Sequence, residues 1–63
     1  MKRRVLLQEL QMIAKNRGLS LDLIRHGANH DLYEVGIIRL TVPRHGDINE
    51  ITASRIIREA KKA

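Results

Sequence analysis

Three histidines, His26, His30 and His45, are the side chains of this chain best suited to proton transfer near neutral pH. Their spacings of four and fifteen residues match no standard zinc pattern. The sequence has no cysteine, which excludes disulfides and thiolate zinc sites. Its four glycines are scattered rather than gathered in a phosphate-binding loop, and no close pair of carboxylates suggests a magnesium site. We therefore expect acid–base chemistry at a histidine without a cofactor, and a metal is optional for it.

His30 has the most suggestive neighbours of the three. It follows a predicted turn at 27–29, and Arg25 lies on the other side of that turn. Arg39 and Arg44 lie on or just after the strand that is predicted to pair with the strand of His30. Guanidinium groups near an imidazole would bind phosphate and assist proton transfer. RNA suits such a site, because its 2′-hydroxyl is a built-in nucleophile. His30 is thus the candidate catalytic residue, and the three arginines are candidate RNA-binding residues.

The composition predicts a small domain with a polyanionic partner. The net charge of +5 fits a nucleic acid or an acidic protein. Apolar residues make up 43% of the 63 positions, which suffices for one domain spanning residues 1–63. Tyr33 is the only aromatic residue besides the histidines, which weighs against binding of single strands by base stacking. No apolar run exceeds three residues, so we expect no transmembrane segment, no signal peptide and a cytoplasmic protein.

Amphipathic helices are predicted near both ends of the chain. Residues 3–17 place their apolar side chains on one face, and Gly18 is a natural stop for that helix. Residues 49–62 show a second apolar face, and either Asp47 or Asn49 could cap this helix. The two faces consist of Leu6, Leu7, Leu10, Ile13 and Ala14, and of Ala53, Ile56, Ile57 and Ala60.

Three strands are predicted between the helices. They span 20–26, 31–35 and 37–42, with a tight hairpin around Gly36 and an end at Pro43, which cannot donate to a sheet. The order of helix, three-stranded antiparallel meander and helix predicts a two-layer α+β domain. Both helices would pack on one face of the sheet and leave the other face open.

Two stretches of the chain match motifs of a known family. Residues 27–33, Gly-Ala-Asn-His-Asp-Leu-Tyr, have the form glycine-x-x-histidine-x-x-aromatic. Residues 42–45, Val-Pro-Arg-His, are followed by Asp-Ile-Asn-Glu at 47–50 and by a helix. In this order and spacing they resemble the turn, the proline-plus-basic loop and the closing helix of the HicA toxins. The opening helix fits as well, so the resemblance covers nearly the whole chain.

The resemblance implies both a fold and an activity. The fold would be like that of double-stranded-RNA-binding domains, with the order α-β-β-β-α. The protein would be the toxin of a type II toxin–antitoxin system: a metal-independent endoribonuclease (mRNA interferase) of the stress response, inhibited by a HicB-like antitoxin. The catalytic histidine of the family corresponds to His30, because the three-residue step to Tyr33 is kept. Neither His26 nor His45 holds that motif position.

The neighbours of His30 depart from the family's pattern. Many members have a serine before the catalytic histidine, where this chain has Asn29. Many also have a second histidine or a basic residue after it, where this chain has Asp31. A carboxylate beside the active imidazole is expected to repel phosphate.

Two other functions fit the same residues. The first is a non-catalytic RNA-binding module that contacts phosphates and 2′-hydroxyls. The second is a small DNA-binding regulator whose recognition helix would be 49–62, with Arg55 and Arg58 facing the DNA. RNA cleavage that persists in a chelator and depends on His30 separates the enzyme from both.

Overall fold

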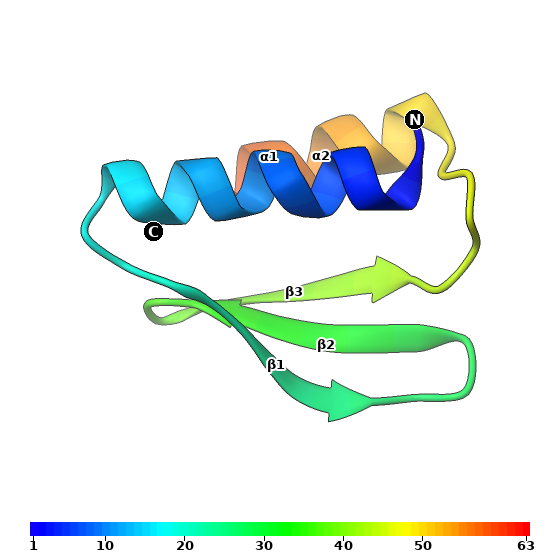
Figure 1. Ribbon diagram of the computed structural model, residues 1–63, viewed down its shortest axis with the longest axis horizontal. Coiled ribbons are helices and arrows are strands. Elements are labelled where there is room, and N and C mark those ends of the chain that lie inside the picture. The colour runs from blue at the N-terminus through cyan, green and yellow to red at the C-terminus, as the bar shows by residue number, and fades with distance from the viewer.

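The computed structural model describes all residues, 1–63, as a three-stranded sheet with two helices. The elements are α1 (Arg3–Asn16), β1 (Leu21–His26), β2 (His30–Val35), β3 (Ile38–Pro43) and α2 (Glu50–Ala60). The strands are antiparallel in the order β1-β2-β3. Both helices lie side by side on one side of the sheet, and the other face is open (Figure 1). This confirms the predicted α-β-β-β-α order and the two-layer α+β fold.

The start of α1 depends on a distant loop. Its N-cap residue, Lys2, makes no side-chain capping bond. Instead, the first helical N–H, that of Arg3, donates to the carbonyl of Gly46 at 3.0 Å. A helix leaves its first N–H groups without partners inside the helix, so the loop after β3 supplies one of them. This contact joins the beginning of the chain to residues more than forty positions away.

The second helix has a conventional cap. The Asn49 side chain accepts a hydrogen bond from the N–H of Ile51 at 2.8 Å, so Asn49, not Asp47, is the N-cap of α2. Asp47 lies 3.5 Å from the amino group of Met1. That amino group also donates a hydrogen bond to the carboxylate of Glu50 at 2.6 Å, and this bond is the main reason why the pKa of the amino group is raised. Neither helix has the length and apolar character that crossing a lipid bilayer would need.

A two-residue hairpin joins β2 to β3. Val35 pairs with Ile38, and Gly36 has a φ of +60°. A positive φ at the first of two turn residues is typical of a type II′ turn, which matches the twist of the flanking strands and favours glycine. The hairpin sets the register in which Ile38, Leu40 and Val42 face the helices, as the alternation of the sequence predicts.

A β-bulge interrupts the pairing of β1 with β2. Leu23 pairs with Tyr33, but the next pair along is Arg25 with Leu32, so Ile24 is an extra residue in β1. Without the bulge, Arg25 would share the face of Leu23. With it, Arg25 turns to the open face of the sheet, and the following residue of β1 turns to the face covered by helices.

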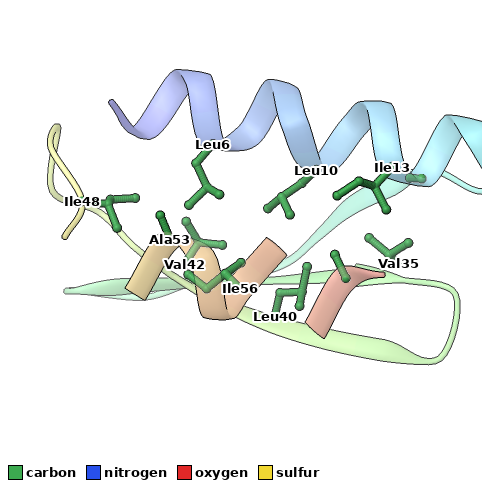
Figure 2. Close-up of a cluster of buried hydrophobic side chains, with 11 residues drawn as sticks. Leu6, Leu10, Ile13, Val35, Leu40, Val42, Ile48, Ala53 and Ile56 are labelled. Carbon is green, nitrogen blue, oxygen red and sulfur yellow. The ribbon is translucent and has the colours of Figure 1, made fainter. Parts of the chain in front are cut away.

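The core lies between the helices and the inner face of β2 and β3. In Figure 2, Leu6, Leu10 and Ile13 point from α1 toward the sheet. Ile48 packs beside them from the loop before α2, a contribution that helical periodicity did not predict. The remaining buried apolar residues are Ala14, Val35, Leu40, Val42, Ala53, Ile56 and Ala60. The edge strand β1 contributes no fully buried side chain, so this core is small.

Removal of a core side chain should destabilise the protein strongly. Leu10 is fully buried, so we expect Leu10→Ala to lower the free energy of unfolding by about 2–5 kcal/mol. Ile37, which is 92% exposed in the hairpin, is the matched control, and Ile37→Ala should change it by less than about 0.5 kcal/mol. Urea unfolding followed by circular dichroism measures both. Equal effects of the two variants would contradict the core described above.

Candidate functional site

One end of the sheet gathers the three histidines and several basic residues. The turn between β1 and β2, the loop after β3 and the start of α1 all lie at this end (Figure 1). Two backbone hydrogen bonds hold these segments together: Arg44 N–H donates to Asn29, and Arg3 N–H donates to Gly46, both at 3.0 Å. Arg3 and Arg44 are far apart in the sequence, and the fold brings their segments together at this end of the sheet. We call this region the histidine end.

His30 is exposed on the open face of the sheet. It is the first residue of β2 and pairs with Pro43 of β3. Its imidazole makes no hydrogen bond and no ion pair within the chain. Asp31, the next residue, points to the opposite face, because successive side chains of a strand alternate, and it is only 3% exposed. The Asp31 carboxylate therefore does not lie beside the His30 imidazole: the two side chains are on opposite faces of the sheet.

The bulge places Arg25 on the same face as His30. Arg25 pairs with Leu32, which is two residues from His30 on β2, so Arg25 and His30 are diagonal neighbours across the strand pair. Diagonal side chains lie roughly 7–8 Å apart, within reach of a long arginine. The structure thus brings together one predicted arginine and the predicted catalytic residue.

Arg39 also faces the open side but lies away from His30. It pairs with Glu34, and its Nε is 3.4 Å from the carboxylate of Glu34. Glu34 is four residues from His30 along β2, roughly 13 Å at the rise of a β-strand. Arg39 is therefore near the far end of the sheet and is paired with a carboxylate, so the predicted grouping of Arg39 with His30 is corrected.

Arg44 contacts the turn at 27–29 and the helix-covered side of the sheet. Its Nη1 donates to the carbonyl of Gly27 at 2.7 Å, and its Nε lies 3.7 Å from the carboxylate of Asp31. Arg44 thus belongs to the histidine end, as predicted, but it contacts the turn and the helix-covered side rather than the open face around His30. Its Nη2 has no hydrogen bond within the chain.

A cluster around Asp31 was not predicted. Its Oδ2 accepts a hydrogen bond from Arg3 Nη2 at 2.7 Å, and Arg3 Nε donates to the carbonyl of Pro43 at 2.9 Å. The Nδ1 atom of His26 lies 2.9 Å from Oδ1. The alternation of β2 did place Asp31 on the inner face, which was the one available signal. Its partners come from α1 and from a bulged strand, which no local pattern identifies.

The histidine end is an open surface rather than a pocket. The hollows of the molecule lie elsewhere: beside Val5 and Met12 of α1, beside Gly18 and Gly36, and between β3 and α2. Small-molecule sites are usually concave, whereas a polymer can bind an exposed, charged surface. No three side chains of His, Cys, Asp or Glu converge as a metal-binding group would.

Comparison of the chain with models of protein families, with curated proteins and with solved structures finds no match. An exposed imidazole with a free arginine on its face and further cations behind it can bind a phosphate and exchange a proton with it.

Gly27 is the residue of the turn at which a substitution should be least tolerated. A Cβ atom at this position would overlap the carbonyl oxygen of His30, which accepts a hydrogen bond from the Gly27 N–H. We expect Gly27→Ala to lower the free energy of unfolding by about 1–3 kcal/mol, as overpacking does. At Gly46 a Cβ would meet no atom within 4 Å and φ is not positive, so Gly46→Ala is the matched control and should be nearly neutral. Urea unfolding compares them, and a neutral Gly27→Ala would contradict this geometry of the turn.

Proposed function

We propose that this protein is a toxin of the HicA type, a metal-independent endoribonuclease that cleaves messenger RNA with His30 as a catalytic residue. The observation that carries the proposal is the placement of His30: exposed, without an intramolecular partner, and on the same face as Arg25 at the basic end of the sheet. The α-β-β-β-α fold also supports it, because the same order follows from the resemblance.

The proposed reaction is cleavage by the 2′-hydroxyl of the substrate. The hydroxyl loses a proton and its oxygen attacks the adjacent phosphorus. The bond to the 5′-oxygen then breaks, and that oxygen takes up a proton. His30 serves one of these two proton transfers. Arg25 stabilises the negative charge that develops on the phosphoryl oxygens, for which a guanidinium is well shaped.

A HicB-like antitoxin is the proposed protein partner. The net charge of +5 suits fast association with an acidic surface, and covering the open face around His30 would exclude RNA. Messenger RNA as substrate implies that the toxin acts in the cytoplasm. No small-molecule cofactor takes part in the proposed reaction.

Replacement of His30 should abolish most of the cleavage. We expect His30→Ala to lower the cleavage rate by about 10²–10⁴, the usual contribution of a positioned acid–base group, with little change in RNA affinity. The matched control is His45→Ala, because His45 is exposed in the loop after β3 and makes no hydrogen bond or ion pair. Single-turnover cleavage of a labelled transcript and filter binding measure the two quantities.

The products and the chelator response complete this test. Cleavage should leave a 2′,3′-cyclic phosphate or the 3′-phosphate derived from it, and EDTA should have no effect. An unchanged rate for His30→Ala would contradict the role of His30. RNA binding without any cleavage by the wild type would favour the non-catalytic module, and preferred binding of duplex DNA would favour the regulator.

Arg25 and Arg39 should differ in their contributions to RNA binding. If about four phosphates are contacted, the logarithm of affinity should fall with the logarithm of salt concentration at a slope of about −3 to −4. Arg25→Ala should make the slope shallower by about 1. Arg39→Ala should change it less, because Glu34 already neutralises Arg39. Fluorescence anisotropy at several salt concentrations measures the slopes, and equal changes would contradict the assignment.

A further inference from the structure

The carboxylate of Asp31 is the only buried charged group, and it lies on the back of the strand that carries His30. Asp31 is 3% exposed and faces the helices, whereas His30, the residue before it, is exposed on the open face. Oδ2 of Asp31 accepts a hydrogen bond from Arg3 Nη2 at 2.7 Å. Near Oδ1 lie His26 Nδ1 at 2.9 Å and Arg44 Nε at 3.7 Å. A buried charge is costly without close partners, so the carboxylate favours one arrangement of these side chains.

Arg3 links the carboxylate to the strand partner of His30. Its Nε donates to the carbonyl of Pro43 at 2.9 Å, while its Nη2 donates to Asp31. A guanidinium is planar and rigid, so the two bonds together fix the Pro43 carbonyl relative to the carboxylate. Pro43 pairs with His30 across β2 and β3. Arg3 therefore holds β3 at the residue that lies opposite His30.

Arg44 links the carboxylate to the turn that precedes His30. Its Nη1 donates to the Gly27 carbonyl at 2.7 Å, and its backbone N–H donates to the Asn29 carbonyl at 3.0 Å. The N–H of Gly27 in turn donates to the His30 carbonyl at 3.0 Å. The backbone on the N-terminal side of His30 is thus fixed by hydrogen bonds from one residue, which itself lies beside Asp31.

The position of the His30 imidazole depends on these backbone contacts. The ring makes no hydrogen bond and no ion pair within the chain, so only the backbone and the rotamer of His30 determine where it lies. Proton transfer needs a separation of roughly 2.6–3.2 Å between heavy atoms. A misplacement of about 1 Å can lower a rate by about 10². An imidazole without a partner of its own therefore needs a rigid backbone.

We propose that Asp31 is a positioning residue of the ribonuclease, which fixes the backbone on both sides of His30 through Arg3 and Arg44. This inference rests on the proposed function, in which His30 is the catalytic residue. It also gives Arg44, which the sequence predicts to bind RNA, a different role: its guanidinium orients the turn instead of binding phosphate. Asp31 acts from the opposite face of the sheet and contacts neither the RNA nor the reacting atoms.

Replacement of Asp31 by asparagine separates positioning from a purely electrostatic effect. Asparagine keeps the size of the side chain and an acceptor for Arg3, but it lacks the charge that orients both arginines. If Asp31 only weakened the positive potential, Asp31→Asn would raise RNA affinity without lowering the cleavage rate. We expect instead that the rate at saturating RNA falls by about 10–10², with RNA affinity equal to or higher than that of the wild type. Single-turnover cleavage and filter binding measure the two quantities.

A charge-conserving variant, Arg44→Lys, separates positioning from phosphate binding. Lysine keeps the positive charge, but its ammonium cannot replace the guanidinium fork between the Gly27 carbonyl and the Asp31 carboxylate. We expect the salt dependence of RNA binding to stay that of the wild type and the rate at saturating RNA to fall by about tenfold. If Asp31→Asn does not fold, Arg44→Lys, at an exposed position, carries the same comparison.

The outcomes separate this inference from the proposed function. Wild-type rates at saturating RNA for Asp31→Asn and Arg44→Lys, with His30→Ala inactive, would overturn the inference and leave the proposed function standing. A wild-type protein that cleaves no RNA would overturn the proposed function itself. The matched control is Ile56→Val, which removes one buried methyl group from α2, an element that contributes no residue to the Asp31 cluster. It should cleave at the wild-type rate, and an equal loss in this variant would overturn the positioning role.

Amide hydrogen exchange tests the same role independently of activity. In Asp31→Asn, the amides of Gly27 and Arg44, which donate to His30 and Asn29, should exchange at least about tenfold faster than in the wild type. The amides in the middle of α1 should change by a much smaller factor, because the core holds that helix. Equal acceleration of all amides would show a loss of overall stability alone and would overturn the inference.

Discussion

The buried carboxylate of Asp31 joins four segments of the chain. Its partners are Arg3 from the start of α1, His26 from the end of β1 and Arg44 from the loop after β3. Burial of a charge costs several kcal/mol, which close partners offset only when the geometry is good. The contribution to net stability is therefore small, but removal of one partner leaves an uncompensated charge. The cluster thus selects the arrangement of the histidine end more than it stabilises the domain.

Polar contacts hold the turn at 27–29, because the apolar core reaches the histidine end only through residues such as Val42 and Ile48 and buries no residue of that turn. Leu6, Leu10 and their partners fill the space between the helices and the inner face of β2 and β3, while β1 remains largely exposed. A chain of 63 residues cannot bury enough apolar surface to fix every loop. The turn at 27–29 is held by Gly27 N–H to the His30 carbonyl and by Arg44 to the Gly27 carbonyl, at 3.0 and 2.7 Å.

One extra residue in β1 decides which side chains each face of the sheet presents at the histidine end. The bulge at Ile24 moves Arg25 to the face of His30 and His26 to the face of Asp31. In a regular strand, Arg25 would lie on the helix-covered face and His26 on the open face. Such a strand would leave Asp31 without an imidazole and His30 without its arginine. Bulges are common next to active sites for this reason, since they re-aim side chains without changing the fold.

The helices, the strands and the two layers follow from local patterns in the sequence. The apolar faces of the helices, the alternation around Leu40, and the turn residues Gly18 and Gly36 each act over a few positions, and a local pattern carries such information. The same local patterns place His30 directly after a turn, which made it the candidate catalytic residue. Four features become visible only in the folded chain: the choice of Asn49 as cap, the burial of Ile48, the separation of Arg39 from His30 and the contact of His26 with Asp31. Such features depend on the register of the paired strands and on long-range contacts, such as those of Arg3 with Asp31 and Pro43. A one-residue shift in register reverses the face of every side chain beyond it, and no periodicity within β1 alone reveals the bulge.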